Sequence, residues 1–167
     1  MDVNAVIHLI DPLFSATVLG MTAYKDRQNR TYRAEWQTFT SNKVNLPFGL
    51  PAAKRLITEH LPKWELRSSK HGDTALCYAN EKKIVLSKTS PLWIVCHEIA
   101  HGLVEEKYLP PGHHEVFRRY YIDVCEDAMS PYWASKLSKS FDAGRLDYRY
   151  PHEQPMSLAQ RIYRIFK

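Results

Sequence analysis

Several features that define whole classes of protein are missing from this sequence of 167 residues. No apolar run approaches the ~20 residues that a helix needs to cross a lipid bilayer, so we expect no contact with a membrane. The opening stretch contains Asp2 and Asp11 but no lysine or arginine, so it lacks the basic start of a secretory signal. These absences predict a cytoplasmic protein.

Cysteine is also scarce. The chain contains only Cys77, Cys96 and Cys125, and no two of them have CxxC spacing. An odd number of cysteines fits a reducing compartment better than a disulfide scaffold. Cys96 precedes His97, but adjacent helical residues point about 100° apart, so its thiol should face away from any ion that His97 binds. We interpret all three cysteines as buried structural thiols.

The composition predicts one globular domain over residues 1–167, with 44% hydrophobic and 25% charged residues. Within it we separate an N-terminal extension (1–45) of unassigned role, a core (64–125) and a C-terminal amphipathic helix (156–167). The net charge of +5 favours contact with nucleic acid through a basic surface, and it fits a basic soluble protein equally well.

The order of expected elements predicts an α+β fold. Segments 63–70, 74–80 and 83–88 are short and alternate in polarity, and turn signals separate them, which predicts a small antiparallel sheet. Ser90 and Pro91 then mark the start of a helix over about 91–106.

Three further helices are expected around this core. Pro51 and Pro62 bracket an earlier helix, a later helix starts near His113, and Ser130 with Pro131 starts another. Residues 28–42 fit either a helix or a strand.

The helix expected over 91–106 contains the sequence CHEIAH. His97 and His101 are four residues apart, so both imidazoles lie on one face and can bind a single metal ion. Glu98 lies one step round and can contact a water molecule on that ion without binding the ion itself. Zinc lowers the pKa of such a water toward 7, and the glutamate takes its proton, as amide hydrolysis requires. We therefore predict a Zn²⁺ site with Glu98 as the catalytic base.

The surroundings of this motif favour a metal site over coincidence. An HExxH sequence arises by chance in roughly a few per cent of such chains. Here it lies in the middle of an apolar helix that follows predicted strands. Two histidines in a buried stripe would be costly without partners, which argues against a purely structural pair.

Catalytic zinc normally has three protein ligands, so one more residue is needed. Glu105 and Glu106 lie too far along the same helix to reach the same ion. His113 and His114 follow the break LPPG and can return toward the first helix if the two helices pack together. From the residues alone, both histidines remain candidates.

The sequences CHEIAHGL and GHHEVF together resemble the SprT/Spartan-like zinc metalloproteases and related small bacterial metallohydrolases. In that family HExxH is followed by a histidine four residues before a phenylalanine, which His113 and Phe117 match. The resemblance covers residues 64–125. It implies a zincin-like fold, one zinc ion held by His97, His101 and His113, and a protein or peptide substrate. The family's glycine after the third histidine is replaced by His114, which can compete as a ligand or contact the ligands from outside.

Two other functions fit the motif. One is zinc hydrolysis of a non-peptide substrate such as RNA, although the endoribonucleases with a related motif place the third histidine closer to the second. The other is a non-catalytic binding or regulatory protein with a zincin-like fold, against which the intact Glu98 argues.

Two further residues or segments could serve the reaction. Tyr121 is a candidate to stabilise the oxyanion, although it also belongs to a core-like stripe with Phe117 and Val124. The strand just before the HExxH helix is predicted to be an edge strand that pairs with an extended peptide.

Overall fold

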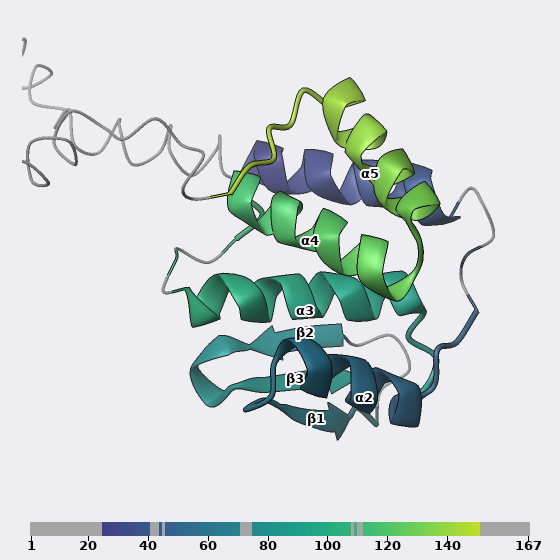
Figure 1. Ribbon diagram of the computed structural model, residues 1–167, viewed down its shortest axis with the longest axis vertical. Coiled ribbons are helices and arrows are strands. Elements are labelled where there is room, and N and C mark those ends of the chain that lie inside the picture. Colours follow the sequence, from purple (N-terminus) through teal and green to yellow (C-terminus); the bar gives the residue numbers. More distant parts are fainter. Residues whose placement is uncertain are drawn as a thin grey trace, which may run out of the picture.

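The computed structural model describes residues 25–40, 44, 46–70, 75–107, 109 and 112–150. They form a mixed α+β structure in which a small sheet is followed by stacked helices (Figure 1). Helix α3 (Leu92–Glu106) lies against the sheet, α4 (Glu115–Ala128) packs on α3, and α5 (Pro131–Ala143) packs on α4. Helix α2 (Leu50–His60) contacts both α3 and the sheet. The predicted α+β class is therefore confirmed.

The sheet is mixed, so the prediction of an antiparallel sheet is wrong in part. Strands β2 (Ala75–Tyr78) and β3 (Lys83–Leu86) pair antiparallel as expected, through the short 3₁₀ helix η3 (Ala79–Glu81). Strand β1 (Glu65–Ser68), however, runs parallel to β3, and the strand order is β1-β3-β2.

Strand β3 occupies the central position in the sheet. Ile84 and Leu86 on β3 are fully buried, and a strand paired on both edges is the best place for such side chains. With β2 paired to one edge of β3, β1 is left on the other edge. The prediction that the strand before α3 is an edge strand is therefore wrong, because this strand is the central β3. The edge strand nearest α3 is β2.

The helix boundaries follow the sequence signals closely. Helices α2 and α5 each begin with a proline in the first turn, as predicted. The start of α3 differs by one residue. The Ser90 hydroxyl accepts a hydrogen bond from the Ser87 amide at 3.1 Å, and the Pro91 carbonyl instead accepts the first helical bonds. Ser90 therefore stabilises the turn before the helix and does not cap it.

The undecided segment at 28–42 is helical over its described part. Residues 25–35 form an α-helix that continues as the π-helix η2 (Trp36–Thr40), beside α4 and α5 in Figure 1. Its buried side chains recur at helical spacing: Thr31, Ala34, Glu35, Thr38 and Phe39. The Thr38 hydroxyl bonds back to the Ala34 carbonyl at 2.8 Å, which lets a polar residue lie on a buried face.

The cysteine prediction holds for two of the three. All three are free thiols, and Cys96 on α3 and Cys125 on α4 are fully buried between these two helices. Cys77 is only half-buried, because it lies on the edge strand β2.

No helix in the described part of the chain is both long and apolar enough to cross a membrane. The predicted C-terminal helix (156–167) and most of the N-terminal extension lie outside the described residues.

Candidate metal centre

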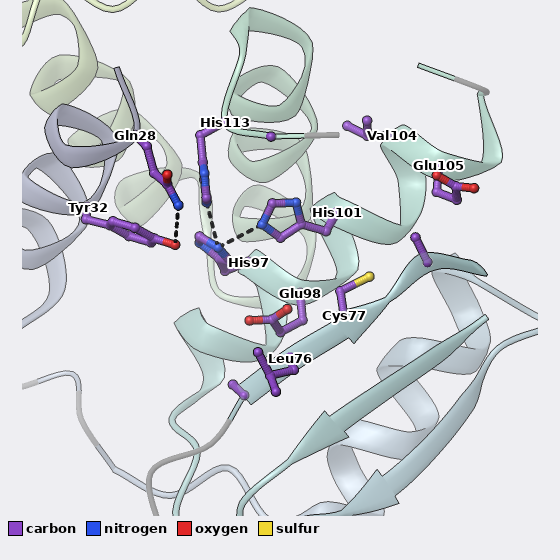
Figure 2. A pocket seen from close by; sticks show the side chains of 13 residues that line it. Gln28, Tyr32, Leu76, Cys77, His97, Glu98, His101, Val104, Glu105 and His113 are labelled. Carbon is purple, nitrogen blue, oxygen red and sulfur yellow. Dashed lines mark hydrogen bonds between the residues drawn. The ribbon is translucent and has the colours of Figure 1, made fainter. Parts of the chain in front are cut away.

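Three histidine side chains converge between α3 and α4 (Figure 2). His97 and His101 project from one face of α3, as the four-residue spacing requires. Nε2 of His97 lies 3.2 Å from Nε2 of His101 and 3.1 Å from Nε2 of His113. His97 and His113 are 6% and 5% exposed, so the site is screened from bulk water.

His113 reaches the group because the chain reverses just before α4. Gly112 has φ 122°, a conformation that only glycine adopts readily, and it turns the chain into His113. The buried Arg118, one turn into α4, holds this turn in place. Its guanidinium donates to the carbonyl of His113 and, at 2.6 Å, to the carbonyl of Asp147. His114 is the N-cap residue of α4 and lies outside the group.

The three imidazoles lie close enough together to bind a metal ion, since their ligand atoms are all within 4.8 Å of one another. Two nitrogen ligands about 2.0–2.1 Å from a tetrahedral zinc ion lie roughly 3.3 Å apart. The separations of 3.1 and 3.2 Å from His97 agree with that geometry. The residues present therefore fit a metal ion held by three imidazole nitrogens.

The protonation of the ligands also suits a metal. Burial lowers the pKa of His113 to about 3, helped by the neighbouring charges of His97 and Arg118. Burial and the adjacent histidines lower the pKa of His101 well below its usual range. Both rings are therefore neutral near pH 7, which is the form that binds metals.

Glu35 is the residue of this site that sequence analysis missed. It is 3% exposed, and its Oε1 lies 2.9 Å from Nδ1 of His97. A carboxylate that accepts the Nδ1 proton fixes the ring and leaves Nε2 free to bind an ion. Burial opposes the charged form of His97, but the charge and hydrogen bond of Glu35 prevail and raise the pKa of His97. The signal in the sequence is that Glu35 is the one carboxylate among residues 31–39, where Ala34 and Phe39 give apolar positions at helical spacing.

Glu98 faces the cavity in front of the histidines. It is 7% exposed, and the backbone amide of Cys77 on β2 donates a hydrogen bond to its carboxylate. Burial is the main cause that raises the pKa of Glu98, and the charge of Glu35 adds to it, while the amide and the charge of His97 oppose it. The carboxylate is thus held next to the histidines with an increased affinity for a proton.

The cavity has a volume of about 330 Å³ and is bounded by α3, β2 and the helix of residues 25–35. Tyr32 forms the wall opposite α3 in Figure 2, and its ring centroid lies 4.8 Å from that of His113. The Tyr32 hydroxyl accepts a hydrogen bond from Gln28 at 3.3 Å. The segment whose role the sequence left unassigned therefore builds one side of the site.

Phe117 and Tyr121 lie behind the histidines. The ring centroid of Phe117 is 4.4 Å from His101, 4.6 Å from His113 and 5.0 Å from His97, so it supports all three rings. Tyr121 is fully buried, does not line the cavity and donates its hydroxyl to the carbonyl of Trp93 at 3.2 Å. This placement argues against the oxyanion role predicted for Tyr121 and agrees with its alternative place in the core stripe.

Comparison with known proteins adds no relative. No family model, no curated protein and no solved structure matches this chain significantly. The case for a function therefore depends on the site itself.

Proposed function

We propose that the protein is a zinc-dependent peptidase with a zincin-like fold, similar to the SprT/Spartan type. The observation that carries the proposal is that three imidazoles and one carboxylate base meet in a single cavity. Three neutral histidines with one open position are the ligand set of catalytic zinc, and imidazole nitrogen suits zinc better than magnesium or calcium.

Each residue of the site has a role in this reaction. When bound, zinc supplies a Lewis acid that makes a nearby water acidic near neutral pH. Glu98 takes the proton of the attacking water and delivers it to the leaving amine, for which a raised pKa is suited. Glu35 keeps His97 in the tautomer that binds through Nε2.

The substrate would lie along β2. This strand pairs with β3 on one side only, and among the described strands nothing pairs with its other side. An extended peptide can add there through main-chain hydrogen bonds, which select little sequence. The edge-strand role predicted for 83–88 thus belongs to β2, whose residues Ala75, Leu76 and Cys77 line the cavity.

RNA fits the cavity less well than a peptide. Among the described lining residues, Glu98 and Glu105 are acidic and no lysine or arginine is present. The cavity therefore offers a polyanion no lysine or arginine to pair with its phosphates. A basic surface elsewhere could still contact nucleic acid.

The test compares wild type with Glu98→Gln. Purified wild type should contain one zinc per chain and cleave denatured protein but not RNA. Glu98→Gln should retain zinc and lose turnover, whereas His97→Ala should lose zinc. Full peptidase activity in Glu98→Gln would remove Glu98 from its role, and protein purified without bound metal that also fails to take up zinc would end the proposal. If Glu98→Gln performed the cellular task of the wild type, a non-catalytic binding protein would be the better account.

A further inference from the structure

The far end of the cavity carries a second carboxylate, Glu105 (Figure 2). Glu98, His101 and Glu105 lie at i, i+3 and i+7 of α3, so they share one face of the helix. Seven residues of helix place Glu105 about 10 Å beyond Glu98 along the axis. The lining of the cavity also includes small or short side chains, among them Ala79, Val104 and Gly112.

The neighbouring Glu106 shows how a structural glutamate on this helix is partnered. Its Oε1 accepts hydrogen bonds from Trp64 at 2.8 Å and from Lys82 at 2.9 Å. Within the described ranges, the carboxylate of Glu105 has neither a hydrogen bond nor an ion pair. The two adjacent glutamates therefore have different surroundings. The carboxylate of Glu106 is hydrogen-bonded to Trp64 and Lys82, whereas Glu105 lines the cavity.

The charge of Glu105 acts inside the cavity. Cys77, which also lines it, has its pKa raised to about 12, first by burial and then by the charges of Glu98 and Glu105. No lysine or arginine is present in the described lining to balance these two carboxylates. The zinc ion would offset the charge near Glu98, and Glu105 would remain as a negative group at the distal end.

We infer that Glu105 is a specificity-determining residue that binds the cationic side chain of a lysine or arginine near the scissile bond. This inference rests on the proposed peptidase function. A carboxylate forms charge-assisted hydrogen bonds with an ammonium or guanidinium group, and these are the strongest kind available to it. If the residue at the scissile bond carries a free α-ammonium group, that group lies within one residue length, about 3.8 Å, of the scissile bond. It is therefore too close to that bond to reach Glu105. A long lysine or arginine stem spans more of that distance.

The experiment uses zinc-loaded full-length protein and a library of N-acetylated peptides, with cleavage sites read by mass spectrometry. Wild type should cleave next to lysine or arginine. Glu105→Gln should lower kcat/KM for a lysine peptide about tenfold and leave the matched norleucine peptide unchanged. Glu106→Gln, the control, should behave as wild type. Peptides with a free N-terminus should be cleaved no faster than their acetylated counterparts. Faster cleavage of the free peptides that depends on Glu105 would assign this residue to a terminal ammonium and overturn the inference.

A binding measurement separates this inference from the proposed function. Zinc-loaded Glu98→Gln protein should bind the lysine peptide about tenfold more tightly than the norleucine peptide in calorimetry, and Glu98→Gln/Glu105→Gln should bind both equally. Preferential binding without any wild-type cleavage would end the peptidase proposal and leave Glu105 as a cation-binding residue. Equal binding of the two peptides by Glu98→Gln, or an unchanged preference after Glu105→Gln, would overturn the inference.

Discussion

Oε1 of Glu35 lies 2.9 Å from Nδ1 of His97, although 62 residues separate the two in the chain. Both groups are buried, and the carboxylate is the only partner that the described residues offer to this ring nitrogen. The contact ties the helix of residues 25–35 to the HExxH helix α3 at the ligand itself. The helix of residues 25–35 is thereby part of the candidate metal centre.

Glu35→Gln should weaken zinc binding by about 10–100-fold, as loss of an outer contact to a metal-bound histidine commonly does. The amide keeps the size of the side chain but removes the charge that orients His97. Zinc affinity would be measured by competition with a chromophoric chelator. The exposed Glu59 on α2 provides the control, since Glu59→Gln removes a similar charge from a residue that does not line the cavity. Equal affinities for both variants would mean that Glu35 only fills space.

His113→Ala and His114→Ala form a matched pair of neighbours. His113→Ala should reduce zinc affinity by more than the ~100-fold expected for an outer contact, because it removes a ligand. His114→Ala should keep full zinc content, since His114 is the N-cap residue of α4 and lies outside the group. Metal analysis after dialysis would distinguish the two variants. Loss of zinc from His114→Ala but not from His113→Ala would make His114 the third ligand in place of His113.

Metal-free protein should become less stable as the pH falls from 6.5 toward about 3. The pKa of His113 is lowered from 6.5 to about 3 by burial, so below pH 6.5 the unfolded chain takes up a proton that the folded chain does not. Each such histidine costs about 1.4 kcal/mol of unfolding free energy per pH unit across that range. His101, whose pKa is also lowered, adds in the same direction. The raised pKa of His97 has a separate effect: its stabilising contribution is complete below pH 6.5 and declines as the pH rises above that value.

Urea denaturation of chelator-treated protein at several pH values would measure this slope. His113→Asn should have a shallower dependence by about one proton, because asparagine does not titrate. An identical slope in wild type and His113→Asn would show that the ring is already protonated in the folded state.

Gly102→Ala should lower the free energy of unfolding by about 1–3 kcal/mol without changing zinc content. A Cβ at this position would lie 2.4 Å from Cδ1 of Leu61 and 3.3 Å from the Trp64 ring, and both side chains are buried. The better helix propensity of alanine, up to about 1 kcal/mol, offsets only part of this. Thermal unfolding would report the loss. Gly102 does not line the cavity, so a changed zinc content in Gly102→Ala would contradict a purely structural role for this glycine.

Local signals in the sequence were sufficient for the histidine pair and its helix. The four-residue spacing of His97 and His101 determines that they share a face once the segment is helical, and the prolines at 51 and 131 mark helix starts correctly. The class α+β and the placement of His113 with the pair also agree with the prediction. All of these depend on contacts within a turn or between consecutive elements.

The errors concern contacts between distant segments. Periodicity identified β1 and β3 as strands, but their parallel pairing depends on which strand best fills the buried centre of the sheet. The helical stripe of Tyr121 fitted both a catalytic and a core role, and only the packing of α4 on α3 turns its hydroxyl to the Trp93 carbonyl.

The sequence by itself therefore determined the chemistry of this protein's site: two histidines and a glutamate on one apolar helix, with a third histidine after a chain reversal. Those features follow from bond geometry and helix period. Only the tertiary structure decided that Glu35 orients His97, that Arg118 holds His113, that β2 is the edge beside the cavity and that Glu105 faces into it. These relationships arise from burial shared by segments far apart in the chain, and no local pattern specifies which buried faces will meet.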